Sequence, residues 1–149
     1  MRNICKQCFL LALLLVVGNS EELLAELRLP AIFGDQMVLQ QKQPITIWGW
    51  AKVGEKIRVE FAGQKVGTTA GKDTRWQVQI AELNASCEAQ TLIVIGDRDT
   101  IQIKDVLVGE VWLCGGQSNM EMTMGGTVNR DMEIASADYD GIRFLRIPH

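Results

Sequence analysis

One short segment has the residue types of a nucleophilic turn. Ser118 lies between Gln117 and Asn119, and two glycines, Gly115 and Gly116, come directly before them. Glycines before a serine let the backbone turn sharply and hold the hydroxyl clear of a sheet. Backbone N–H groups at Ser118 would then point at an oxyanion formed when the hydroxyl attacks a carbonyl. The spacing differs from the Gly-x-Ser-x-Gly elbow, so a polar turn without chemistry is the alternative.

The elements around this turn predict an α/β arrangement. Residues 108–113 are a nearly continuous apolar run, which is typical of a strand buried on both faces. Thr127 can cap a helix over residues 128–135, and residues 142–147 (IRFLRI) have the composition of another strand. A strand, glycine turn, helix and strand form a βαβ unit, and catalytic groups collect at the carboxyl ends of such strands. One unit leaves its sheet largely uncovered, so we expect residues 108–149 to be the start of a larger α/β domain.

The chain before this unit alternates apolar and polar residues with a period of two. The apolar positions of four such runs are Ile45 and Ile47; Ile57, Val59 and Phe61; Trp76, Val78 and Ile80; and Ile101 and Ile103. Residues 61–64 and 96–99 have the composition of hairpin turns in which glycine supplies a positive φ. Short strands at regular spacing predict an all-β, sandwich-like domain over residues 21–107.

The first twenty residues have the order of a secretory signal peptide. Arg2 and Lys6 give a positive start, residues 8–17 are an unbroken apolar run, and Gly18, Asn19 and Ser20 follow it. The run is shorter than the roughly 20 residues that a bilayer-spanning helix needs. We therefore expect cleavage near Ser20 and a secreted or periplasmic protein with no stable membrane insertion. The alternative is an uncleaved anchor.

Composition and cysteine placement exclude some classes of function. The 149-residue chain has 47% hydrophobic residues and a net charge of −3, so it offers no basic surface for nucleic acid. Two of its four cysteines, Cys5 and Cys8, fall in the leader, where they have no partner ligands for a metal. Cys87 and Cys114 would remain after cleavage. An oxidising compartment would allow them to pair, but we expect two buried or unpaired thiols.

Two parts of the chain carry a family resemblance: residues 109–121 (GEVWLCGGQSNME), and upstream residues 29–40 (LPAIFGDQMVLQ) and 44–51 (PITIWGWA). The first resembles the first conserved block of the sialate O-acetylesterase family, which belongs to the SGNH, or GDSL-like, hydrolases. The upstream segments resemble those that open the same family's N-terminal β-domain. The resemblance spans about residues 27 to 147. Position 115 is Gly where members often carry Ser, and residues 122–124 (MTM) replace a more aromatic stretch.

The resemblance implies an α/β SGNH fold that removes O-acetyl groups from a sugar such as sialic acid, without a metal or cofactor. Ser118 would be the nucleophile, and its own N–H would donate to the oxyanion hole. Gly116, Gln117 and Asn119 would hold the turn or line the pocket. An acetylxylan-type esterase and a non-catalytic carbohydrate-binding β-sandwich are the alternatives.

A serine nucleophile needs an oriented base, which an Asp-x-x-His segment supplies in this superfamily. The only histidine of this chain is His149, and Arg146 rather than Asp lies three residues before it. We therefore expect the chain to be an N-terminal portion of an esterase that has no activity on its own.

The four tryptophans allow a second interpretation. Aromatic faces suit sugar rings, so Trp48, Trp50, Trp76 and Trp112 could form a stacking platform. Trp48 and Trp50 are two residues apart and would share one face of a strand. The favoured interpretation is an aromatic core between two sheets.

Overall fold

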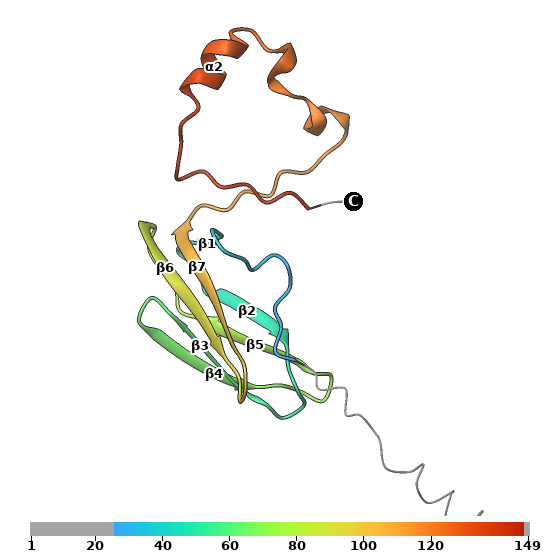
Figure 1. Cartoon of the computed structure of the whole chain (residues 1–149), viewed down its shortest axis with the longest axis vertical. Helices are drawn as coiled ribbons and strands as arrows, with labels where there is room; N and C mark the ends of the chain where they lie inside the picture. The colour runs from blue at the N-terminus through green and yellow to red at the C-terminus, as the bar shows by residue number, and fades with distance from the viewer. Residues whose placement is uncertain (1–25, 148–149) are drawn as a thin grey trace, which may run out of the picture.

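A curled body of strands carries a long C-terminal segment (Figure 1). The computed structural model describes residues 26–147. The predicted signal peptide and His149 lie outside the described residues. In this part of the chain no helix is long and apolar enough to cross a membrane.

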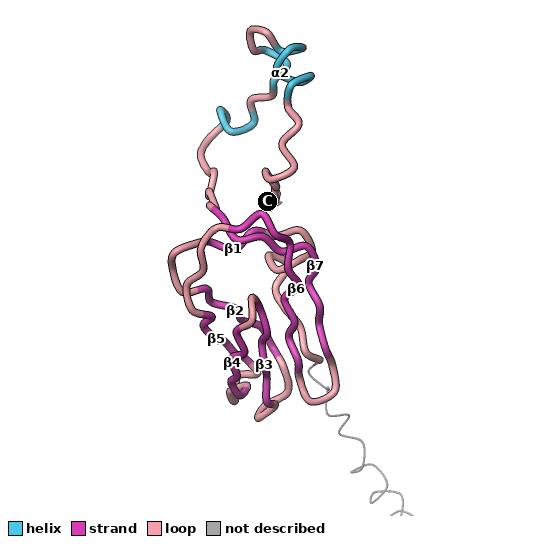
Figure 2. Tube along the Cα trace, turned by 90° about the vertical axis from the view of Figure 1, so that its left-hand side faces the viewer, coloured by secondary structure: helices cyan, strands magenta, loops and turns pink. Residues whose placement is uncertain are grey.

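The described residues contain seven strands in two sheets. The strands are β1 (Val38–Gln40), β2 (Ile45–Trp50), β3 (Lys56–Phe61), β4 (Gln64–Thr69), β5 (Arg75–Ile80), β6 (Ser86–Ile95) and β7 (Thr100–Gly109). Five of them form a sheet in the order β1-β7-β6-β3-β4, and β2 pairs with β5 in a separate ribbon. The β1–β7 pair is parallel, whereas the other strand pairs are antiparallel. Figure 2 shows how the strands curl around one interior.

Both sheets contribute to one hydrophobic core. Ile47 and Ile80 from the ribbon, and Val59, Leu92 and Val94 from the larger sheet, are fully buried. Each such side chain contributes about 1.5–3 kcal/mol through burial. The apolar positions that the period of two singled out are buried, apart from Ile101, which packs at the margin of the core. The burial of these positions confirms the prediction. Its physical reason is that inward side chains alternate with solvent-facing ones along each strand.

The two predicted hairpin turns differ in why they need glycine. Ala62 and Gly63 have φ angles of 48° and 76° and join β3 to β4 in a two-residue turn. Gly96 joins β6 to β7 without a positive φ, so that part of the prediction is wrong. A Cβ at Gly96 would lie 2.3 Å from the Glu55 carboxylate, so a side chain there would require the Glu55 side chain, which accepts from Asp97 N, to move.

The predicted βαβ unit is absent from the described residues. Its helix exists as α2 (Arg130–Ser136), but Asn129 rather than Thr127 is the N-cap residue. Of the first predicted strand, residues 108–113, only Val108 and Gly109 are in a strand, as the last two residues of β7. Residues 110–117 and 142–147 contain no strand. A strand needs a neighbouring strand to hydrogen-bond with its N–H and C=O groups. No strand of the described residues pairs with residues 110–113 or 142–147.

Two short 3₁₀ helices precede α2. They are η1 (Ser118–Glu121) and η2 (Met124–Gly126), and neither contains a buried residue. Residues 110–147 leave the end of β7, run outward through these helices and return toward the sheet (Figure 1). Their large apolar side chains are exposed, with Leu113 at 92% and Phe144 at 94% of full accessibility.

Candidate functional site

The predicted nucleophile lies at the surface of the exposed segment. Ser118 is the first residue of η1, and its side chain makes no hydrogen bond with any described residue. Gln117 caps this helix with an extended backbone, and its carbonyl accepts a hydrogen bond from Met120 N at 2.9 Å. A free hydroxyl at the start of a helical turn is accessible to an ester. No described side chain is placed to remove its proton.

The other predicted site residues surround Ser118 in the same turn. Gly116 and Asn119 are exposed, and the Asn119 carbonyl accepts from Met122 N at 3.3 Å. A Cβ at Gly116 would lie 3.1 Å from Met120 Cγ, so a larger residue there would press on the turn. Gly116, Gln117, Ser118 and Asn119 are consecutive and lie in one exposed turn, and their role as a site stays a prediction.

The predicted position of this turn in a sheet is wrong. The strand before it, β7, pairs antiparallel with β6 and parallel with β1 inside the β-body, which comprises strands β1 to β7 and the residues that join them, and it ends at Gly109. Eight residues of extended, exposed chain separate that end from Ser118. The turn consequently does not lie at the carboxyl edge of a parallel strand in the described residues.

A glutamine pair holds the start of the exposed segment against β1. Gln40 Nε2 and Gln41 Nε2 donate to the two carboxylate oxygens of Glu110 at 3.2 and 2.6 Å. Val111 N donates to Gln40 Oε1 at 2.7 Å. The hydrogen bonds from Gln40 and Gln41, together with the charge of Lys42, lower the pKa of Glu110 below its ordinary value. Sequence reasoning missed these contacts because they join residues about 70 positions apart.

Acid is expected to loosen this attachment. Because the pKa of Glu110 is lower in the folded chain than in the unfolded one, its stabilisation is complete above the unfolded pKa. It is lost as the pH falls through the lowered folded pKa. In a carboxyl NMR titration, the Glu110 midpoint should lie below the value of about 4.3 for a glutamate in a peptide.

Gln41→Leu should raise that midpoint, because it removes one of the two donors. Gln102→Leu, at an exposed position of β7, is the matched control and should leave it unchanged. A Glu110 midpoint at or above the peptide value in the unmodified chain would contradict the prediction.

A second attachment lies near the end of the segment. Arg143 Nη2 contacts Asp105 Oδ1 at 2.9 Å, and Nη1 donates to the Asp105 carbonyl. The Arg143 side chain is only 19% exposed, whereas its neighbours are exposed. Asp105 holds a left-handed φ of 56° within β7, a conformation that Asp tolerates better than most residues. The segment that carries Ser118 is thus fastened to the β-body at both of its ends.

The remaining cysteines are unpaired and exposed. Neither Cys87 nor Cys114 forms a disulfide, which agrees with the prediction of free thiols. Burial, the other possibility in that prediction, is found for neither. Cys87 points outward from β6, and Cys114 lies in the extended chain before the serine turn, where no second layer covers it.

The tryptophans divide between core and surface. Trp76 is 3% exposed and belongs to the core, as the favoured interpretation predicted. That interpretation is wrong for Trp48, which is 39% exposed, and for Trp112, which is 82% exposed. Trp48 and Trp50 share the outer face of β2, as their spacing predicted, and Trp50 is half-buried.

Comparison with known proteins relates the chain to carbohydrate esterases. No protein-family model matches it. The sialate O-acetylesterase of Mus musculus is 30% identical over 129 residues, which cover 78% of this chain and 24% of the mouse protein. The sialate O-acetylesterase of Homo sapiens is 32% identical over 134 residues, which cover 80% and 25% of the two chains.

A solved structure is similar to the chain in both sequence and fold. A carbohydrate acetylesterase from Xanthomonas citri is 35% identical, with a TM-score of 0.71 over 76% of this chain and 26% of that one. The chain therefore spans about a quarter of the length of the relatives that it matches.

Proposed function

We propose, from the premise that this chain is a relative of the sialate O-acetylesterases, that it forms part of a serine esterase which removes O-acetyl groups from carbohydrates. The observation that carries the proposal is the 30–32% identity to curated sialate O-acetylesterases over most of the chain. The exposed, unbonded hydroxyl of Ser118 supports it, because a nucleophile must reach its ester.

In this proposal residues 108–149 are the start of an SGNH-type α/β domain, and residues 21–107 form the β-domain beside it. The exposed apolar side chains of residues 111–147 support this division, because side chains such as Trp112, Leu113 and Phe144 need a covering layer. That layer would also supply the base for Ser118. The leader over residues 1–20 supports export, so the substrate would be met in an extracytoplasmic compartment.

In the mechanism that follows from this proposal, the chain supplies the nucleophile and one donor to the oxyanion. Ser118 Oγ would attack the acetyl carbonyl, and the carbonyl oxygen would gain negative charge. The N–H of Ser118 would donate to that oxygen, an effect worth about 3 kcal/mol for a well-placed donor. Gln117 and Asn119 would orient the turn or contact the sugar. The proton of Ser118 would leave to a base outside the described residues.

Two forms of the chain test the proposal. The purified 149-residue chain should not hydrolyse p-nitrophenyl acetate, because no described group activates Ser118. A chimera in which this chain replaces the matching N-terminal stretch of the human relative should hydrolyse it. O-acetylated sialic acid and acetylated xylan as substrates would distinguish the two esterase classes. A soluble, folded chimera that releases no acetate from any of the three would overturn the proposal.

A further inference from the structure

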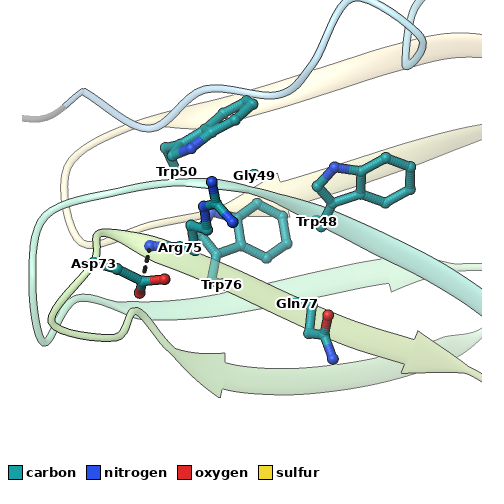
Figure 3. A pocket seen from close by; sticks show the side chains of 7 residues that line it. All are labelled: Trp48, Gly49, Trp50, Asp73, Arg75, Trp76 and Gln77. Atoms are coloured by element: carbon teal, nitrogen blue, oxygen red, sulfur yellow. Dashed lines mark hydrogen bonds between the residues drawn. The ribbon is translucent and has the colours of Figure 1, made fainter.

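The outer face of the β2–β5 ribbon carries a hollow that the esterase site does not use. Its volume is about 540 Å³, within the range of roughly 300–1,000 Å³ that is usual for small-molecule sites. The strand register places Trp48 opposite Gln77 and Trp50 opposite Arg75. The close-up shows the side chains of Trp48, Trp50, Arg75 and Gln77 around the hollow (Figure 3), whereas Trp76, which alternates with Arg75 and Gln77 along β5, is buried in the core.

The two aromatic rings of this hollow are held in place from outside it. The Phe33 ring meets the Trp48 ring at 74°, with centroids 4.6 Å apart. The Arg28 guanidinium lies over the Trp50 ring, 5.0 Å from its centroid. Rings fixed before a ligand arrives lose little conformational entropy on binding, which favours affinity.

The polar groups of the hollow are available to a ligand. No side-chain hydrogen bond or ion pair joins the guanidinium of Arg75 or the amide of Gln77 to another described residue. Asp73 Oδ1 accepts only the backbone N–H of Arg75, at 3.3 Å.

We propose that this hollow binds a sugar ring that carries a carboxylate. The C–H face of a pyranose is apolar and would stack on Trp48, while its hydroxyls would reach Gln77 and Asp73. Arg75 would pair with the carboxylate as a planar donor. Two arginines, Arg75 in the hollow and Arg28 beside Trp50, outnumber Asp73, the single acid of the lining, although the chain as a whole has a net charge of −3. An acidic sugar fits this local charge better than a neutral one.

The site is independent of the esterase chemistry, because it lies on the ribbon of the β-body and uses no residue of the Ser118 turn. Its occupant would therefore be bound without being hydrolysed. The site would serve to hold a glycan chain to the protein, whether or not Ser118 acts on that chain.

An NMR titration of the full chain tests the proposal. The probe is 3′-sialyllactose, which has a carboxylate and no O-acetyl ester, and lactose is its neutral counterpart. The indole N–H signals of Trp48 and Trp50 should shift with 3′-sialyllactose, and that of Trp112 should not. Trp48→Ala should weaken binding at least about tenfold, whereas Trp48→Tyr should keep most of it. Trp112→Ala is the matched control for the loss of an exposed indole.

Arg75→Gln should reduce binding of 3′-sialyllactose to the level of lactose, because only the carboxylate contact is lost. The melting temperature of each variant is measured, and binding is compared only among variants that remain folded. Trp48→Tyr keeps an aromatic face, so it distinguishes loss of the stacking surface from loss of folding. No shift at Trp48 and Trp50, equal binding of the two sugars by the unsubstituted chain, or unchanged binding by Trp48→Ala would each overturn the proposal. None of these results depends on whether the chimera hydrolyses an ester.

Discussion

Ser118→Ala is expected to lower ester hydrolysis by the chimera about a thousandfold or more. Removal of a serine nucleophile eliminates the covalent step and leaves only oxyanion stabilisation and substrate binding, as in other serine hydrolases. Ser118 is exposed, and its side chain has no described partner, so its loss should cost almost no stability. The measurement is kcat/KM for p-nitrophenyl acetate, with the melting temperature recorded beside it.

Ser136→Ala is the matched control for this substitution. Ser136 is also exposed, ends α2 and donates to the Glu133 carbonyl at 3.1 Å. Its loss should leave kcat/KM within about twofold, because it touches no part of the serine turn. Fluorophosphonate should label the unsubstituted chimera and not the Ser118→Ala form. Persistent labelling of Ser118→Ala would show that another residue is the nucleophile.

The β-body could be predicted from the sequence because its signal is local. Inward positions such as Ile47, Val59 and Val78 recur every second residue, and each lies in a strand whose pairing partner is present in the chain. The β1–β7 pair could not be predicted in this way. It joins Val38 to Leu107, and no spacing pattern reports which distant strand will be the neighbour.

The serine turn was recognised from residue types, but its setting was not. The apolar run at residues 108–113 has the composition of a buried strand, yet composition cannot say whether a partner strand lies beside it. Here β7 takes Val108 and Gly109 into the β-body, and the rest of the run is exposed. The contacts that fasten the segment, Glu110 with Gln41 and Arg143 with Asp105, join residues far apart in the sequence. Only coordinates bring such pairs together.

The β-body and the segment from residue 110 have different roles. The β-body has its own core, paired strands and a hollow with fixed aromatic rings, so it can bind a ligand as it stands. The segment from residue 110 has a reactive residue type but no core of its own. Thermal unfolding of the chain therefore measures the stability of the β-body. Ester hydrolysis by the chimera depends on the part of the human relative that is joined to the segment.

Gly49→Ala is expected to destabilise the β-body by about 3 kcal/mol, near the upper end for overpacking a closely filled site. A Cβ at position 49 would lie 2.3 Å from the Arg28 carbonyl oxygen and 2.9 Å from Trp76 Cζ2. The Arg28 carbonyl cannot yield easily, because it accepts from Trp50 N at 3.0 Å, and Arg28 N donates back to Trp50 O at 2.9 Å. The extra methyl group must therefore break this bridge or push Trp76 out of the core.

The measurement is thermal unfolding of the full chain, in which Gly49→Ala should lower the melting temperature by about 10 °C. Gly67→Ala is the matched control, since Gly67 also lies within a strand and its added Cβ would meet only the Ile57 carbonyl oxygen, at an ordinary 3.5 Å. That variant should be unchanged or more stable by up to about 1 kcal/mol, because alanine replaces a flexible strand glycine. Equal melting temperatures for the two variants would show that Arg28 and Trp76 do not close over Gly49 as described.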